Sequence, residues 1–402
     1  MKNLDDQSNA AKAIQTVNDG IIAYCKFLSA NDTSTTGAHQ SGIYITKNAN
    51  KILFDEPGEK GQNKDRTVKI KWQDDFTTES RFIYYGQGTR NEYRITRFNR
   101  GFPFLRPEHT GDLFVFVKMS EEDYYAYVLP TDDEINDFLD AFGMSPTDTG
   151  NIIRKEWNRP EEKVADAIKK YIGELEVDFP VSSEMSRVAR SIFNDVYNHV
   201  ENITMEPDKR IIEWINMEYQ LFREIEFVRY GEFITNGFDS VEDFISIANM
   251  VLNRRKSRAG KSLEHSLSAI FDGNKLKYVS QPRTEGNKRP DFLFPDADAY
   301  NDKTFPAENL VFLGAKTTCK DRWRQIINEA NRIGEKHLFT LQQGISSAQL
   351  DEMKEERIIL VVPEPYIVTF PSEKRSDIWT LRKFIEYVKE KTDGQFHRSL
   401  TR

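Results

Sequence analysis

Apolar and polar residues alternate in short runs over the first third of the 402-residue chain. Before these runs, apolar residues recur at helical spacing and predict a helix over 10–28. The runs themselves are rich in β-branched and aromatic residues and predict strands. They lie at 43–45, 67–72, 80–85, 93–98, 113–118 and 124–129. Strands of this length and spacing indicate a β-barrel or sandwich, and we expect it to form a first domain over 1–150.

The middle of the chain has helical patterns. A short helix is predicted at 132–143, and an amphipathic helix at 159–176 within a polar connector. Longer helices are predicted at 182–200 and 209–233. We place a linker at 151–181. The two longer helices are candidates for a dimer interface or a connector, and packing in a core explains them equally well.

From about residue 240 the pattern becomes α/β, which predicts a central mixed sheet covered on both faces. The expected helices are 240–252, 261–272, 321–333, 346–355 and 377–391, with a basic turn at 253–261. The expected strands are 276–280, 291–294, 310–316, 337–341 and 357–362. This part, 182–402, is predicted to be the second domain.

Composition suits a soluble globular protein, with 30% charged and 12% aromatic residues. No apolar run approaches the roughly 20 residues that span a bilayer, and the first residues lack the pattern of a signal peptide. We therefore expect no membrane partner. Cys25 and Cys319 show neither metal-site spacing nor a disulfide framework. A cytoplasmic location is the simple interpretation.

The net charge of −8 argues against a non-specific nucleic-acid coat. It does not exclude a sequence-specific DNA enzyme, because binding to DNA depends on the local charge of the binding face and not on the net charge of the chain. Basic residues do gather at 90–100, at 254–261 and at 316–324, while acidic residues lie largely elsewhere.

Two residues next to apolar runs are candidates for catalysis. Asp291 follows Pro290 and precedes Phe-Leu-Phe, although Asp is disfavoured in strands and costly to bury alone. An ordinary turn acid is an equally good interpretation of this residue by itself. Lys316 ends the run Leu-Val-Phe-Leu-Gly-Ala, where a solvent-exposed strand exit is the alternative. Near two carboxylates and a phosphate, a lysine can orient the attacking water and stabilise charge.

Glu329 supplies a second carboxylate. It borders the apolar face of the expected helix 321–333, which argues for a side chain turned toward the sheet edge rather than a surface acid. Two carboxylates suit a hard cation such as Mg²⁺. The six histidines are scattered and form no zinc pattern.

These residues resemble the PD-(D/E)XK nucleases and, within them, the EcoRII-like type II restriction endonucleases. In the second half of the chain the resemblance rests on 253–264, 284–295 and 316–325 with 328–330. In the first half it rests on 28–33, 37–44 and 89–97.

The resemblance implies roles for the candidate residues. Asp291 and Lys316 would be the Pro-Asp and the lysine of the superfamily motif. Gly314 stands where the motif normally has an acid, so Glu329 would be the second carboxylate and, with Asp291, would hold Mg²⁺. Glu264 would be an acid on the preceding helix that supports the site, although a solvated helix acid is the alternative.

The resemblance also implies how DNA is recognised. Asp321 and Arg322, beside Lys320, would read a CC:GG element, which implies a site such as CCWGG. Arginine can donate to O6 and N7 of guanine, and an acid can accept from N4 of cytosine. The alternative is that Asp321 is an ordinary acid at a helix N-terminus and Arg322 is solvated. The cluster at 254–261, with Arg254, Arg255 and Arg258, is expected to hold phosphates.

The N-terminal domain resembles the effector domain of the same family, a DNA-binding pseudobarrel. Its candidate DNA-reading residues are His39, Tyr44, Arg90, Glu92, Arg94 and Arg97. Arg94 and Arg97 would lie on opposite faces of a regular strand. The family scheme further implies an additional effector copy of the DNA site, and an N-terminal domain that covers the catalytic cleft until DNA engages it.

The sequence therefore predicts a multidomain α+β protein, with an N-terminal β-pseudobarrel and a C-terminal α/β/α restriction-endonuclease-like domain. We expect a Mg²⁺-dependent, homodimeric type II restriction endonuclease that acts on double-stranded DNA. A cognate cytosine methyltransferase is expected in the host, not as a bound partner. The alternatives are a methylation-dependent nuclease and a non-catalytic DNA-binding regulator.

Overall fold

The chain divides into two compact units in the computed structural model, which describes residues 8–33, 42–153, 161–197 and 204–399, with side chains to 392. The first unit comprises 1–158 together with 342–351 and 366–375. The second comprises the remaining segments, 159–341, 352–365 and 376–402. Within the described ranges, no helix is long and apolar enough to cross a membrane.

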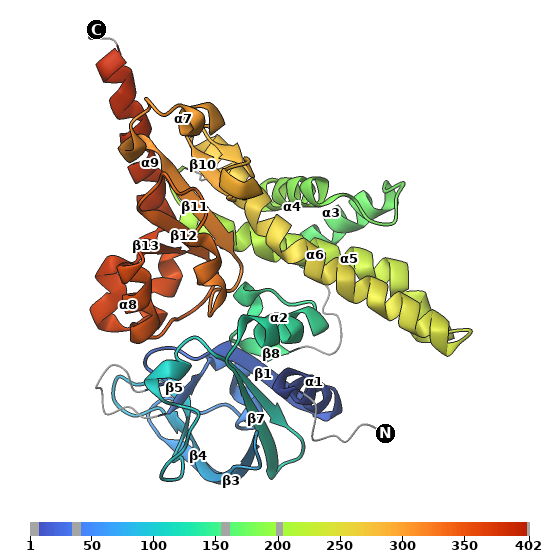
Figure 1. Cartoon of the computed structure of the whole chain (residues 1–402). Coiled ribbons are helices and arrows are strands. Elements are labelled where there is room, and N and C mark those ends of the chain that lie inside the picture. The colour runs from blue at the N-terminus through green and yellow to red at the C-terminus, as the bar shows by residue number, and fades with distance from the viewer. Residues whose placement is uncertain (1–7, 34–41, 154–160, 198–203, 400–402) are drawn as a thin grey trace. The chain divides into compact units, whose positions relative to one another are not determined.

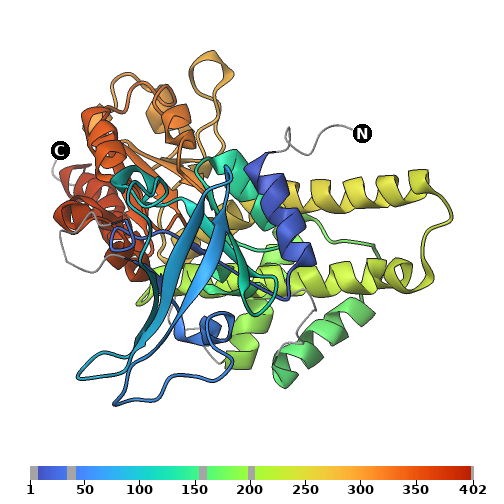
Figure 2. The same cartoon turned by 90° about the horizontal axis from the view of Figure 1, so that it is seen from below.

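The first unit is built on an eight-stranded sheet that curls on itself (Figure 1, Figure 2). The strand order is β2-β5-β4-β3-β7-β6-β1-β8, and β3 and β7 are the parallel neighbours in an otherwise antiparallel sheet. The strands are β1 (Ile22–Phe27), β2 (Ile43–Ile45), β3 (Lys64–Trp72), β4 (Thr77–Tyr85), β5 (Glu92–Thr96), β6 (Leu113–Lys118), β7 (Asp123–Leu129) and β8 (Asn151–Ile153). The prediction of a β-rich N-terminal domain is confirmed.

Both faces of this sheet are covered. Aromatic side chains, among them Trp72, Phe82 and Tyr124, fill the inside of the curl. The other face packs against α1 (Asn9–Asp19) and α2 (Asp132–Ala141). Because β6 faces both cores, all six of its residues are buried.

The predicted helix over 10–28 is wrong in its second half. Helix α1 ends at Asp19 with Gly20 as its C-cap, and β1 begins at Ile22. A Cβ on Gly20 would come within 2.2 Å of the Val117 side chain, so the chain passes close to β6 at this point. Pairing of β1 with β6 and β8 overrides the helical spacing of its apolar residues.

The second unit contains a six-stranded mixed sheet in the order β14-β13-β12-β11-β10-β9. Strands β9, β10 and β11 pair antiparallel, whereas β11 to β14 run parallel. The strands are β9 (Val279–Ser280), β10 (Phe292–Phe294), β11 (Val311–Lys316), β12 (Lys336–Thr340), β13 (Ile358–Val362) and β14 (Trp379–Thr380). The predicted mixed sheet is confirmed.

Helices make up most of the rest of this unit. They are α3 (Glu162–Gly173), α4 (Ser182–Tyr197), α5 (Pro207–Asn236), α6 (Val241–Gly273), α7 (Ala297–Asn301), α8 (Ser347–Glu355) and α9 (Leu381–Ser399), and α8 also includes residues 347–351 of the first unit. Helix α6 packs against β11, and α9 packs against β13 and β14. Every residue of the central strand β12 is buried, as expected of a strand covered on both faces.

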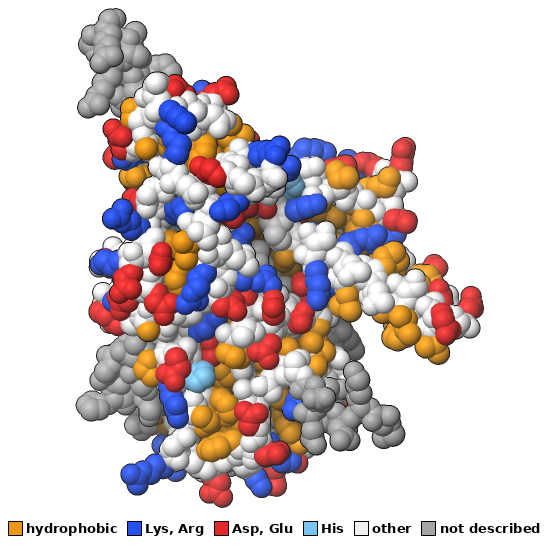
Figure 3. Space-filling view, in the orientation of Figure 1, with side chains coloured by type: hydrophobic (Ala, Val, Ile, Leu, Met, Phe, Trp, Pro, Cys, Tyr) orange, Lys and Arg blue, Asp and Glu red, His pale blue; other side chains and the backbone are white. Residues whose placement is uncertain are grey.

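The expected basic turn at 253–261 is wrong, because α6 runs unbroken through it. The segment is rich in lysine and arginine, which form helices well, and a Cβ on Gly260 would meet open space. Helices α5 and α6 form a hairpin whose far end exposes apolar side chains (Figure 3). These are Ile234, Phe238, Val241, Phe244 and Ile245.

The predicted helix over 321–333 is also wrong. Only a short 3₁₀ helix forms, at Arg322–Ile326, and the chain then turns through Ala330, whose φ is +48°. The apolar residues that suggested an amphipathic helix are nevertheless mostly buried, including Trp323, Ile326 and Ile333. Compact turns can bury apolar residues at a spacing that also fits a helix.

Candidate active site

Asp291 and Lys316 meet where β10 and β11 pair. Asp291 stands just before β10 and is buried, and Lys316 is the last residue of β11. One carboxylate oxygen of Asp291, Oδ2, accepts a hydrogen bond from the Ala315 backbone N–H at 2.8 Å. The same oxygen lies 3.5 Å from Nζ of Lys316. The antiparallel pairing thus brings together two residues that are distant in sequence.

Glu329 and Glu264 share the electrostatic environment of this pair. Burial raises the pKa of Glu329, the charge of Asp291 raises it further, and Lys316 opposes both. The pKa of Glu264, on α6, is likewise raised by burial and then by Asp291, with Lys316 again opposing. The Glu264 carboxylate accepts a hydrogen bond from Gln281 at 2.9 Å. Asp291 and Lys316 are therefore in contact, and Glu264 and Glu329 lie near enough to be influenced by the charges of both.

The donor chemistry of these acids fits a hard divalent cation. The charge of Asp291 raises the pKa of both Glu264 and Glu329, and a cation among these carboxylates would relieve that repulsion. Within the described part of the chain, no three His, Cys, Asp or Glu side chains form a cluster that could hold a metal ion by themselves. Mg²⁺ commonly takes one or two protein carboxylates and completes its shell with water and phosphate oxygens.

Gly314 allows the segment that follows Lys316 to pack closely on β11. A Cβ at Gly314 would lie 2.9 Å from Cγ2 of Ile326, a distance that real Cβ contacts do not show. The segment from 322 to 333 therefore packs directly on β11 through Ile326. That same segment carries Glu329 into the site.

The predicted DNA-reading segment begins shortly after Lys316. Asp321 is exposed and Arg322 is half-buried at the start of the 3₁₀ helix, whereas Lys320 is buried. The buried Trp323 anchors the segment, and Arg324 pairs with Glu352 of α8.

The three arginines expected to hold phosphates are instead held by neighbouring elements. Arg258 is only 7% exposed, stacks 3.7 Å above the Tyr219 ring and lies 3.8 Å from the Glu218 carboxylate. Arg255 donates to Glu226 at 2.9 Å. Arg254 stacks 3.9 Å above the Phe179 ring and donates to Tyr230. This burial speaks against a phosphate contact by Arg258, because its guanidinium lies inside the protein.

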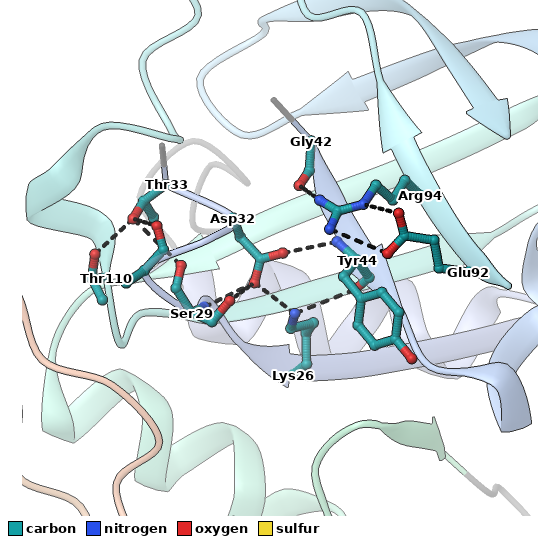
Figure 4. A network of polar contacts seen from close by, with 10 residues as sticks. Lys26, Ser29, Asp32, Thr33, Gly42, Tyr44, Glu92, Arg94 and Thr110 are labelled. Atoms are coloured by element: carbon teal, nitrogen blue, oxygen red, sulfur yellow. Dashed lines mark hydrogen bonds and ion pairs between the residues drawn. The ribbon is translucent and has the colours of Figure 1, made fainter. Parts of the chain in front are cut away.

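In the first unit, three of the predicted DNA-reading residues line one cavity of about 610 Å³. Tyr44 of β2 pairs in register with Arg94 of β5, and Arg94 forms an ion pair with Glu92 at 3.4 Å (Figure 4). Burial, then Glu92, raises the pKa of the Tyr44 hydroxyl.

The other predicted readers do not line this cavity. Arg90 is exposed and lies 5.1 Å from the centre of the Tyr85 ring. Arg97 is exposed beyond the end of β5, whereas Arg94 is buried, so these two arginines differ in environment as expected. His39 lies outside the described residues.

Lys26 and Asp32 belong to the same cavity region and were not predicted. Lys26 Nζ lies 2.6 Å from the buried Asp32 carboxylate, which also accepts from the backbone N–H groups of Ser29 and Tyr44 (Figure 4). The expected helix over 10–28 concealed Lys26, because it placed that residue on a helix instead of on β1, from which its Nζ reaches the Tyr44 carbonyl at 3.3 Å. Asp32 lies in a segment, 28–33, that carries part of the family resemblance.

Comparisons with known proteins match both halves of the chain. The family model described as Restriction endonuclease EcoRII, N-terminal, matches residues 17–142, and that described as EcoRII C terminal matches 222–385. Type II restriction enzyme SsoII of Shigella sonnei is 27% identical over 142 residues, 31% of this chain and 46% of its own.

Solved structures align less completely. Metal-depleted Ecl18kI in complex with uncleaved, modified DNA covers 57% of this chain and 84% of its own, with a TM-score of 0.45 and 20% identity. The restriction endonuclease PspGI-substrate DNA complex covers 54% and 94%, with a TM-score of 0.44 and 12% identity.

The most extensive of these matches is to Type II restriction enzyme EcoRII of Escherichia coli. It is 38% identical over 389 residues, which are 91% of this chain and 94% of that protein. Identity at this level over nearly the whole of both chains means that this chain belongs to the EcoRII family of type II restriction enzymes.

Proposed function

We propose that the chain makes Mg²⁺-dependent double-strand breaks in DNA at a short site that contains CC and GG, such as CCWGG. The observation that carries the proposal is the contact of Asp291 with Lys316, 3.5 Å apart where β10 and β11 pair, and the charge of Asp291 also raises the pKa of Glu329. Asp291 and Glu329 would hold Mg²⁺, and Glu264 would support them from α6. When bound, Mg²⁺ polarises the phosphate and lowers the pKa of a bound water. Lys316 would orient the attacking water and stabilise charge on the phosphate.

Recognition of the site would come from the segment that joins Lys316 to Glu329. Arg322 would donate to O6 and N7 of guanine, and Asp321 would accept from N4 of cytosine. Because one short segment carries both these residues and Glu329, matching bases would also set the position of the scissile phosphate. Lys320 has the least support as a DNA contact, since it is buried.

The first unit would bind an additional, effector copy of the DNA site. Support comes from the cavity that places Tyr44, Glu92 and Arg94 together with Lys26. The phenol and the cations can bind phosphates or base edges, and Glu92 can accept from an amino group. Arg90 and Arg97, both exposed, would lie at the margins of this surface.

The first unit would also inhibit cleavage until effector DNA binds. Thr340, at the end of β12, lies in register with Lys316, and two residues later the chain enters the first unit as segment 342–351. There the buried Gln342 donates to the Gly111 carbonyl at 2.7 Å. Segment 366–375 is tied to the same unit, where the Ala30 N–H donates to the Thr369 carbonyl at 2.9 Å. A movement of the first unit would therefore shift the end of β12, which pairs with β11 at Lys316.

The active form would be a homodimer in the cytoplasm, with each subunit cutting one strand. A near-palindromic site is matched by two-fold symmetry of the protein. Exposed apolar side chains at the end of the α5–α6 hairpin suit contact with a second copy of the chain. The host would carry a cognate cytosine methyltransferase to protect its own DNA.

Run-off sequencing of plasmid DNA treated with the protein, with and without Mg²⁺, tests this proposal. We expect cuts at a CC/GG-containing site that require Mg²⁺ and unmethylated substrate. Cuts that require methylated cytosine would replace the proposal with a methylation-dependent nuclease. Tight, specific binding without cuts under any metal condition would contradict the nuclease proposal altogether.

A further inference from the structure

The turn that carries Glu329 lacks the support of a helix. The 3₁₀ helix ends at Ile326, and the Glu329 N–H bonds to the Ile326 carbonyl at 3.1 Å, only three residues earlier. At the next residue, Ala330, φ is +48°, a left-handed conformation that is uncommon for a residue with a Cβ. Other contacts must therefore fix the direction of the Glu329 side chain.

Two lysines bind the backbone just before Glu329. Lys288 Nζ donates to the Asn328 carbonyl at 2.6 Å, and Lys336 Nζ donates to the Ile327 carbonyl. Lys288 stands three residues before Asp291, and Lys336 begins β12, the strand beside β11. The ammonium groups thus come from segments next to the two other members of the site.

Lys336 is only 7% exposed, which is costly for a lysine. Burial lowers the pKa of Lys336, the Glu329 carboxylate opposes this effect, and Nζ donates to the Ile327 carbonyl. A residue whose sole task were to fill space would not need an ammonium group here.

The other side of the turn is held by Glu285 and Tyr300. The Glu285 carboxylate accepts from the Tyr300 hydroxyl and from the Asn331 N–H at 3.4 Å, just beyond Glu329. The turn is therefore fixed on both sides of the acid, by side chains from three other segments of the second unit.

We propose that Lys336, with Lys288, is a positioning residue that aims the Glu329 carboxylate at the metal site shared with Asp291. The inference rests on the proposed role of Glu329 as a metal ligand. In this arrangement two hydrogen bonds from lysines to backbone carbonyls fix the turn, as the backbone hydrogen bonds of an α-helix would fix a helical segment. Because Lys336 is buried, it acts through the backbone of the turn and through its charge.

The test uses the full-length protein with Lys336→Met, which removes the donors and the charge, and Lys336→Arg, which restores both. Mn²⁺ binding in the presence of a duplex is followed by the EPR signal of the free ion, and single-turnover cleavage is measured over a range of Mg²⁺ concentrations. We expect Lys336→Met to weaken Mn²⁺ binding and to raise the Mg²⁺ midpoint by about tenfold or more, as loss of a group that orients a metal ligand does. DNA affinity without metal stays unchanged, and Lys336→Arg recovers most of the loss.

Lys118→Met is the matched control, because Lys118 is also a buried, ion-paired lysine but lies in the first unit. It is expected to lower stability without changing Mn²⁺ binding. If Lys336→Met does not fold, Lys288→Met takes its place with the same expected shift, since Lys288 is half-exposed. Wild-type Mn²⁺ binding in the lysine variants overturns the proposal.

Glu329→Gln distinguishes the role of Glu329 as a metal ligand from the positioning role of Lys336. If Glu329→Gln binds Mn²⁺ as the wild type does, the role of Glu329 itself is wrong. If Glu329→Gln loses Mn²⁺ but Lys336→Met does not, only the positioning role is overturned.

Discussion

His337 is a buried group whose shifted pKa makes the stability of the folded protein depend on pH. Its ring lies on β12 within 5.1–5.2 Å of the ring centres of Trp379, Phe384 and Tyr387, and the residue is 1% exposed. Burial, with a smaller effect from the charge of Lys391, lowers the pKa of His337 to about 4. In the unfolded chain a histidine titrates near its ordinary value of about 6.5.

The unfolded state therefore binds a proton more readily than the folded state between these two values. The stabilisation is fully present above about pH 6.5 and is lost as the pH falls toward 4, by about 3 kcal/mol in all. We expect the free energy of unfolding in urea to fall between pH 7.5 and pH 5, and His337→Phe to remove much of that fall. An equal fall in the wild type and in His337→Phe would show that other groups cause it.

At the residue scale, the position of Asp291 and Lys316 next to apolar runs suggested that the two residues meet, and the pairing of β10 with β11 brings them together. The sequence predicts Arg258 poorly. A basic cluster looks the same in the sequence whether it faces DNA or pairs internally. The partner of Arg258, Glu218, lies on α5, and only the packing of α5 on α6 reveals it.

At the scale of elements, Gly314 links β11 to the turn that carries Glu329. In Gly314→Ala the new methyl group would press on the buried Ile326, so either the strand or the turn must move. We expect a loss of about 1–3 kcal/mol in the free energy of unfolding, as is usual for overpacking, and a marked loss of cleavage. Gly173→Ala is the control, because a Cβ there meets open space. A Gly314→Ala protein as stable and active as Gly173→Ala would mean that the turn does not depend on this contact.

Strands were predicted more reliably than helices. Short runs of β-branched and aromatic residues with polar flanks identify β3 to β7 and β10 to β13 with small errors at their ends. The helices over 10–28 and 321–333 failed for a common reason. Apolar residues at helical spacing indicate only that these residues are buried. In 10–28 the burial arises from pairing with β6, and in 321–333 it arises from packing on β11.

At the scale of the whole molecule, the units are discontinuous in sequence. Segments 342–351 and 366–375 lie far along the chain but belong to the first unit. No local pattern predicts this, because the partners of these segments, such as Gly111 and Ala30, lie in the first third of the chain. The expected boundaries near 150 and 181 remain a prediction.

Removal of the first 160 residues tests the proposed inhibition by the first unit. The remaining chain keeps α3 and every element of the six-stranded sheet. We expect it to cleave single-site DNA without effector DNA, and faster than the full-length protein, because segment 342–351 loses its inhibiting partner. Single-turnover rates of the two proteins on one-site and two-site plasmids measure this. A truncated protein that folds and binds DNA but never cuts would contradict the inhibition proposal.

The central claim is that Asp291 and Lys316 form the catalytic site, and single-turnover plasmid cleavage by Asp291→Ala and Lys316→Ala tests it most directly. Asp298→Ala and Lys303→Ala serve as controls, because both side chains are exposed in the segment after β10. We predict that the two site variants bind DNA but cut it more slowly by about 10³-fold or more, as expected when a group that stabilises the transition state is lost, while the controls cut normally. Cleavage by either site variant at close to the wild-type rate would contradict the account.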